Sequence, residues 1–170
     1  LWNDNKDDCI EKYGHISDWD TSKITDISYL FKDMKYFNED ISRWVVSSVK
    51  SMKCLFYGTT DFDQDISSWD TSEVETMTYM FREAEYFNQD ISSWDTRQVK
   101  CMKYMFCQAH DFNQDISNWV TSNVKDMSGM FWAASYFNKD ISSWNTSDVN
   151  NIEEMFEYCP IPKEYKPVFN

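Results

Sequence analysis

The chain has 170 residues, enough for one ordinary globular domain and too few for two large ones. Hydrophobic residues make up 42% of it and aromatic residues 18%, a composition that excludes an intrinsically disordered chain. The net charge of −13 disfavours nucleic acid and anionic membranes as partners, and no apolar run reaches the roughly 20 residues of a membrane-spanning helix.

The first 15 residues differ in pattern from the rest of the chain. Residues 4–13 have the pattern of a short helix that ends at Gly14. Cys9 falls in a column that later units fill with small residues. The pattern predicts that residues 1–15 form an N-terminal capping segment.

A 25-residue period organises the chain after this segment. Its columns are Ile at 16, 41, 66, 91, 116 and 141, Trp at 19, 44, 69, 94, 119 and 144, and Phe at 31, 56, 81, 106, 131 and 156 and at 37, 62, 87, 112 and 137. A fixed period of this length is the signature of a repeat architecture. We therefore expect a six-unit solenoid over residues 16–165, with units 16–40, 41–65, 66–90, 91–115, 116–140 and 141–165.

The third unit shows the structure that we expect within each repeat. Residues 65–69 are typical of a brief strand, and residues 70–72 of a turn in which Ser72 pairs with Glu75 as a capping box. The apolar residues that follow lie in one stripe of a helix: Val74, Met77, Met80, Phe81, Ala84 and Phe87. This pattern predicts an α/β fold, a repeat solenoid with one short strand and one helix per 25-residue turn. Because one unit cannot bury its stripe alone, neighbouring units must stack. The tryptophans are expected to be buried and stacked from turn to turn.

The C-terminal end also departs from the repeat. Pro160, Pro162 and Pro167 stop the last helix after Cys159. We expect residues 163–170 to form an extended cap or the start of a linker, with residues 166–170 as a C-terminal tail.

Some units resemble a known family closely. The motifs are Phe-Asn-Gln-Asp-Ile-Ser-Ser-Trp-Asp-Thr at 87–96, its copy at 112–119, and Val-Lys-Asp-Met-Ser-Gly-Met-Phe at 124–131. They resemble the BspA-like leucine-rich-repeat surface proteins over about residues 12 to 159. The resemblance implies a leucine-rich-repeat-like fold, a cell-surface location, and adhesion or protein binding.

Two polar columns follow the repeat. An aspartate column holds Asp40, Asp65, Asp90, Asp115 and Asp140, and a second column holds Asn38, Asp63, Asn88, Asn113 and Asn138. The aspartates could form a calcium ladder, but calcium loops normally include glycine, which is missing. We favour carboxylates that accept backbone N–H groups in the turn, and buried amides that bond to the next unit. We expect no metal and no cofactor.

The cysteines and histidines do not form a reactive set. The five cysteines, an odd number, lie too far apart in the repeat to pair, and no metal-ligand spacing appears. Five free thiols favour a reducing compartment or a buried assembly, which conflicts with the surface location of the resembled family. His15 and His110 lie far apart, and the sequence predicts no catalytic residues and no enzyme.

Aromatic residues mark the outer side of the expected helices. The candidate interface residues are Trp132, Tyr104, Cys107, Tyr136, Tyr57 and Tyr79. Protein interfaces are enriched in Tyr and Trp, although tyrosines can also pack flat between neighbouring helices. We expect Gly129 to leave the Trp132 indole uncovered. These residues indicate a non-catalytic protein-binding or scaffold module in a larger assembly.

The expected strand side carries hydroxyl groups instead. Serine recurs at 17, 42, 67, 92, 117 and 142, and threonine at 21, 71, 96, 121 and 146, with Val46 interrupting. The alternative function is therefore a cell-surface adhesin that recognises protein or glycan through this face. Adsorption of ice is a further possibility, although the hydroxyls more simply satisfy local turns.

Overall fold

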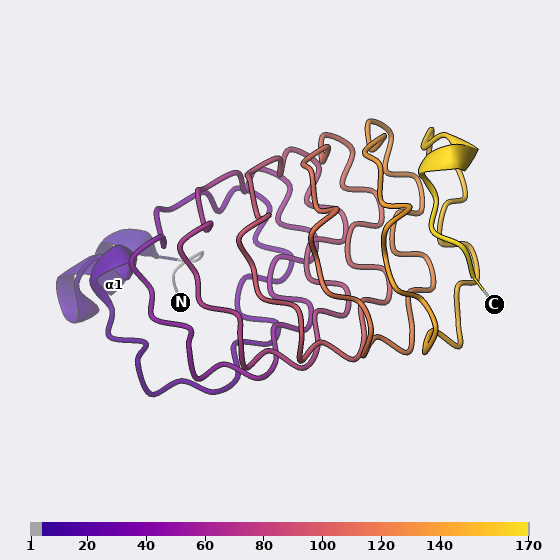
Figure 1. The fold of residues 1–170 in the computed structure, drawn as a ribbon. Coiled ribbons are helices and arrows are strands. Elements are labelled where there is room, and N and C mark those ends of the chain that lie inside the picture. The colour runs from indigo at the N-terminus through magenta and orange to yellow at the C-terminus, as the bar shows by residue number, and fades with distance from the viewer. Residues whose placement is uncertain (1–4, 170) are drawn as a thin grey trace.

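Successive 25-residue segments form coils that lie side by side in register, in a computed structural model that describes residues 5–169 (Figure 1). We number the coils one to six by the residue ranges 16–40, 41–65, 66–90, 91–115, 116–140 and 141–165. Parallel β-bridges join equivalent positions of neighbouring coils, at Asp26, Ser51, Thr76, Cys101, Asp126 and Asn151. Hydrogen bonds between backbone groups therefore hold neighbouring repeats together.

Regular secondary structure is sparse. Residues 5–169 include one α-helix, α1 (Lys6–Tyr13), and two 3₁₀ helices, η1 (Ile16–Asp18) and η2 (Lys163–Tyr165). Asn5 caps α1 by accepting the N–H of Asp8, and the N–H of Gly14 donates to the carbonyl of Ile10 at 2.9 Å. The expectation of a short N-terminal helix ending at Gly14 is confirmed for the described residues, with Cys9 buried.

The predicted α/β solenoid is wrong, because within residues 16–159 the structure forms neither α-helices nor strands longer than one bridge. In the third coil the N–H groups of Met77, Tyr79 and Phe81 donate to carbonyls of the fourth coil at 2.9–3.1 Å. The N–H groups of Met80 and Arg82 donate back three residues within the same coil, and that of Thr78 donates to the Thr76 hydroxyl. A helix would need all of these donors for itself.

Left-handed backbone conformations explain this alternation. Two positions of each coil have positive φ: Tyr29, Cys54, Tyr79, Tyr104, Gly129 and Glu154 at the first, and Asp33, Gly58, Glu83, Gln108, Ala133 and Tyr158 at the second. For a residue with a side chain, the left-handed backbone conformation is less favourable than the right-handed one by roughly 1–2 kcal/mol of free energy. A residue in this conformation also ends any right-handed helix. The bonds to the next coil offset this cost.

The predicted strand and capping box are also replaced by turns. The N–H of Trp69 donates to the carbonyl of Ile66, and that of Val74 to Thr71, so both segments bend instead of extending. Ser72 donates its N–H to the Asp70 carboxylate and does not form the expected pair with Glu75.

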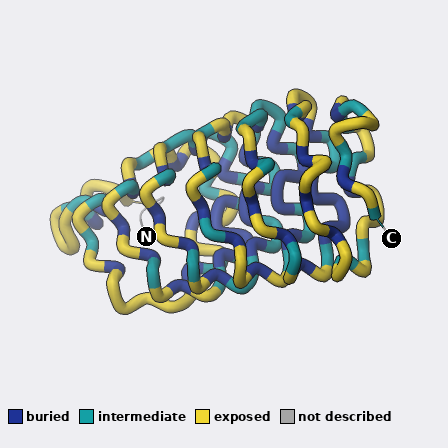
Figure 2. The backbone as a smooth tube through the Cα atoms, viewed as in Figure 1, coloured by how far each residue is buried: buried dark blue, intermediate teal, exposed yellow. Residues whose placement is uncertain are grey.

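Ladders of aromatic rings fill the core. Phe81 and Phe106 stack with centroids 5.7 Å apart, and Phe87 and Phe112 at 6.1 Å, as in the other coils. The tryptophans from Trp69 to Trp144 stack at 6.4–6.5 Å with rings within 4° of parallel. Figure 2 shows the buried positions recurring from coil to coil. The expected burial is confirmed for Trp44, Trp69, Trp94 and Trp119, and the expected stacking is confirmed from Trp69 onward, whereas Trp19 is only partly buried.

Five tryptophans of this column also bond one coil to the coil before it. The indole N–H of Trp94 donates to the carbonyl of Ile66 at 3.1 Å, and five coils repeat this bond between Trp44 and Trp144. Burial of an indole with its N–H satisfied contributes strongly to stability.

The C-terminal segment covers part of the last coil. The N–H of Ile141 donates to the carbonyl of Tyr165 at 3.0 Å, and the Thr146 hydroxyl donates to the carbonyl of Val168. Ile161 is buried against the core. Residues 163–169 therefore act as a cap, and Asn170 lies outside the described residues.

Replacement of Trp94 by alanine should lower the free energy of unfolding by about 3–5 kcal/mol, because it opens a large cavity and removes an interior hydrogen bond. Urea denaturation followed by far-UV circular dichroism measures the change.

The matched control is Tyr36→Ala, since Tyr36 is 75% exposed. It should change the free energy by no more than about 0.5 kcal/mol. Equal effects of the two substitutions would contradict a core built on the tryptophan ladder.

Candidate protein-binding surface

The backbone of each coil determines which side chains point outward. In the third coil Met77, Met80 and Phe81 are fully buried, whereas Tyr79 and Arg82 are partly exposed. Tyr79 has a left-handed backbone, and its side chain turns away from the core although Met77 and Met80 on either side of it are buried. The face that the sequence assigned to the outside of a helix is therefore the outside of the coils.

Tyrosines of this face stack across the coils. Tyr79 and Tyr104 lie nearly parallel with ring centroids 5.5 Å apart, and the edge of Tyr57 meets Tyr79 at 6.4 Å. The Arg82 guanidinium carbon lies 5.3–5.7 Å from the centroids of all three rings. Cation–π attraction and stacking hold these side chains together before any partner binds.

Gly129 makes room for Tyr104, not for Trp132 as the sequence suggested. A Cβ atom at Gly129 would lie 2.1 Å from the Tyr104 ring, and the φ of Gly129 is +58°. Only glycine allows both the backbone conformation and the close approach of the ring.

The Tyr104 hydroxyl is fixed by a carboxylate two coils away. It donates to Oε2 of Glu154 at 2.9 Å, since the intervening position is Gly129. This hydrogen bond, with a smaller contribution from burial, raises the pKa of Tyr104 to about 12.

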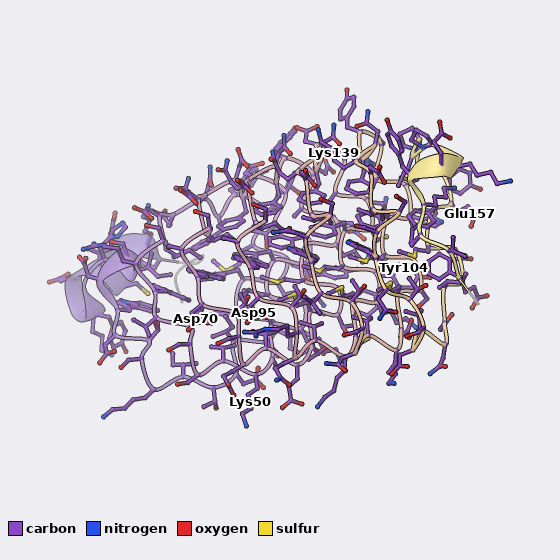
Figure 3. All side chains as sticks on the ribbon, viewed as in Figure 1. Lys50, Asp70, Asp95, Tyr104, Lys139 and Glu157 are labelled. Carbon is purple, nitrogen blue, oxygen red and sulfur yellow. The ribbon has the colours of Figure 1, made fainter. Side chains whose placement is uncertain are left out.

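A hollow of about 610 Å³ lies beside these rings, lined by Tyr79, Arg82, Lys103, Tyr104, Cys107, Gln108, Trp132, Glu154, Glu157 and Tyr158. Trp132 and Tyr158 meet edge to face with centroids 5.6 Å apart. Figure 3 places Tyr104 and Glu157 in the C-terminal half of the stack. Two lining residues are basic and two are acidic. We define the aromatic surface as Tyr57, Tyr79, Tyr104, Trp132 and Tyr158.

The structure brings four of the six predicted interface residues to the hollow. They are Trp132, Tyr104, Cys107 and Tyr79, and Tyr57 adjoins them through Tyr79. Tyr136 is exposed but does not line the hollow. Cys107 is buried, and this burial raises the pKa of its thiol to about 11. Its side chain therefore packs beneath the hollow and is not an exposed contact.

Sequence reasoning missed Arg82, Glu154 and Tyr158. Arg82 occupies the column of Tyr57, Cys107 and Trp132, so a systematic use of the columns would have found it. Glu154 and Tyr158 belong to the sixth unit, whereas the predicted interface residues all come from the second to fifth units.

The aspartate column serves the turns, as the preferred interpretation predicts. The carboxylate that ends each coil from one to five accepts the N–H two residues later, as Asp65 from Ser67 at 2.9 Å. The Ser67 hydroxyl and N–H hold the pKa of Asp65 below its usual value. Within residues 5–169, no three His, Cys, Asp or Glu side chains are arranged to hold a metal ion.

The other polar columns form bonds between coils. Asn88 accepts the N–H of Asn113 at 3.0 Å, which confirms the bonding role of the amides, although Asn88 is exposed and not buried as expected. Thr96 is buried and donates its hydroxyl to the carbonyl of Val120 at 2.9 Å. The expected open strand of hydroxyls is thus replaced by turns whose groups are largely bonded.

The thiols and imidazoles remain apart, as expected. All five cysteines are free. His110 contacts the carbonyl of Ala133 and the Ser135 hydroxyl through Nδ1, and His15 contacts Ser17.

One family model, described as "Mycoplasma protein of unknown function, DUF285", matches the chain twice, over residues 7–106 and 64–164. Two overlapping matches indicate a repeat protein. No curated protein and no solved structure matches the chain. Within the described residues, no helix has the length and apolar character needed to cross a lipid bilayer.

Excess chelator should leave the melting temperature unchanged, because the aspartates bond to backbone N–H groups. Differential scanning calorimetry with and without EDTA tests this. A large drop restored by calcium would support the calcium ladder instead, since a ligand that binds only the folded state stabilises it.

Gly129→Ala should return the pKa of Tyr104 from about 12 toward the ordinary 10, because the displaced ring loses its bond to Glu154. NMR titration of ¹³C-labelled tyrosine measures this pKa. Gly14→Ala is the control, because Gly14 also has positive φ but a Cβ there meets nothing within 4 Å. Both substitutions strain the backbone, but only the first should change the titration.

Proposed function

Because this chain belongs to the family described as Mycoplasma protein of unknown function, DUF285, a description that names no activity, we propose a function from geometry alone. We propose that the protein is a non-catalytic module that binds a protein partner through the aromatic surface, as a scaffold in a larger assembly. The observation that carries the proposal is the hollow of about 610 Å³ lined by Tyr79, Tyr104, Trp132 and Tyr158.

The residue types of this surface suit a protein partner. Tyr, Trp and Arg dominate the binding energy of protein interfaces. Here Arg82 lies over three tyrosine rings, and Trp132 and Tyr158 form a perpendicular pair. Since these contacts already fix the side chains, binding would cost little side-chain entropy.

The charges of the hollow indicate how a partner would be oriented. Arg82 and Lys103 line it together with Glu154 and Glu157. A partner segment with both charge types around an apolar centre would match this arrangement. The net charge of −13 argues against nucleic acid as that partner.

A non-catalytic role fits the use of the polar groups. The aspartates accept turn N–H groups, and the buried threonines donate to the next coil. Because these side chains are hydrogen-bonded to the backbone, they are poor candidates for general acids or bases. The alternative, an adhesin that binds through the serine and threonine side, has fewer free hydroxyls than the sequence suggested.

We also propose that the stack is a solenoid related to BspA-like leucine-rich-repeat surface proteins. The 25-residue period and the motifs at 87–96 and 124–131 support this relationship. The coils of this chain differ from a strand-and-helix repeat, because residues 16–159 form no α-helix and no strand longer than one bridge.

Trp132→Ala should weaken partner binding by about 2 kcal/mol or more, near 30-fold in Kd, because an interface tryptophan in a hollow contributes strongly. Cross-linking from a photoreactive residue at position 79, in cells that make the protein, would identify the partner. Calorimetry with that partner would then give the affinity.

Ser92→Ala is the control, because Ser92 lies on the opposite, turn-bearing side and should change the affinity little. If Ser92→Ala abolished binding and Trp132→Ala did not, the adhesin hypothesis would replace this one. Unchanged melting temperatures of both variants are required for the comparison.

A further inference from the structure

A row of backbone donors runs along one half of every coil. Four alternating residues donate to the next coil; in the fifth coil they are Met127, Gly129, Phe131 and Ala133, which bond to carbonyls of the sixth coil at 2.8–2.9 Å. The equivalent residues of the sixth coil are Ile152, Glu154, Phe156 and Tyr158. Their N–H groups have no acceptor within residues 5–169.

The C-terminal cap leaves this row open. The cap bonds to Ile141 and Thr146, on the other half of the sixth coil. On the open half the Lys166 ammonium lies 4.9 Å from the Phe156 ring centroid. Ile152 is 40% exposed and Tyr158 is 73% exposed. We call the four N–H groups and their side chains the open edge.

The chain itself shows what such an edge binds. The same donors of the third coil, at Met77, Tyr79, Phe81 and Glu83, bond to carbonyls of residues 101, 103, 105 and 107 at 2.8–3.1 Å. This accepting segment carries Lys100 and Lys103. A chain segment with carbonyls at alternate positions therefore fits the row, as in the addition of a strand to a sheet edge.

The charges of the open edge indicate which kind of chain segment it would attract. Glu153, Glu154 and Glu157 are exposed on the open edge, and residues 151–158 include no lysine or arginine. A segment with lysine or arginine at its outward positions would pair with these carboxylates, whereas an acidic segment would be repelled.

We propose that the open edge binds an extended basic segment of a protein partner, which adds to the stack as the accepting half of a seventh coil. This inference goes beyond the proposed function, because main-chain donors and not aromatic side chains make the contact. The edge adjoins the hollow through Glu154 and Glu157, so one partner could contact both.

The probe is a synthetic peptide of residues 99–110 with serine in place of Cys101 and Cys107. Amide hydrogen exchange by NMR should show at least tenfold slower exchange of Ile152, Glu154, Phe156 and Tyr158 when the peptide is present. The amides of Met127, Gly129, Phe131 and Ala133 are internal controls, since they are already bonded.

A peptide with Lys100→Glu and Lys103→Glu should give no protection. In the protein, Glu153→Lys combined with Glu157→Lys should abolish protection, whereas Glu73→Lys, an exposed position in the third coil, should not. Absence of protection with the basic peptide, or equal protection with the acidic one, would overturn the proposal.

Two further outcomes separate this edge from other sites. If Trp132→Ala removed the protection, the peptide would be bound in the hollow, and the edge proposal would be wrong. Protection that appeared without peptide as the protein concentration rose would make a second copy the occupant, also against the proposal. Protection that persists in Trp132→Ala supports the edge whether or not the aromatic surface binds a partner.

Discussion

The donation of alternate backbone N–H groups to carbonyls of the next coil is the interaction on which the structure depends. Each bond joins residues 24 apart, as from Phe81 to Met105, and this fixed separation places every side chain against its copy one repeat later. The phenylalanine and tryptophan ladders follow from that register. A single inserted residue would place polar positions of one coil against the rings of its neighbour, so the constant period is a condition of the core.

Burial could be predicted from the sequence, but the backbone path could not. The stripe from Val74 to Phe87 is buried in the structure, yet it is not helical. Apolar residues at these spacings satisfy both a helix and a series of tight turns that face the same core. Left-handed positions decide between the two, and most are Tyr, Cys, Glu or Gln, which give no sign of positive φ. Gly58 and Gly129 are the only glycines among the twelve.

The candidate surface was predictable in position and less so in detail. The columns correctly indicated that Tyr79, Tyr104 and Trp132 face outward. Exposure, however, depends on the neighbours within a column, and the short Cys107 lies between the larger Arg82 and Trp132. Likewise the partner of Tyr104 is Glu154, two coils away, because Gly129 leaves no side chain between them. Such contacts depend on adjoining coils and cannot be derived from one repeat.

The direction of the bonds between coils gives the stack an electrical polarity. Between the third and fourth coils four backbone N–H groups donate toward the C-terminal end, and three, from Lys100, Asp111 and Asn113, donate back. The excess of forward over backward bonds leaves a small net dipole along the stack, unlike a helix, in which all peptide units align. The C-terminal end gains partial positive charge from its unbonded N–H groups, and Glu153, Glu154 and Glu157 oppose it there. Because this partial charge resides on the terminal N–H groups, a stack with more coils would present the same charge at its end, only farther from the opposite end.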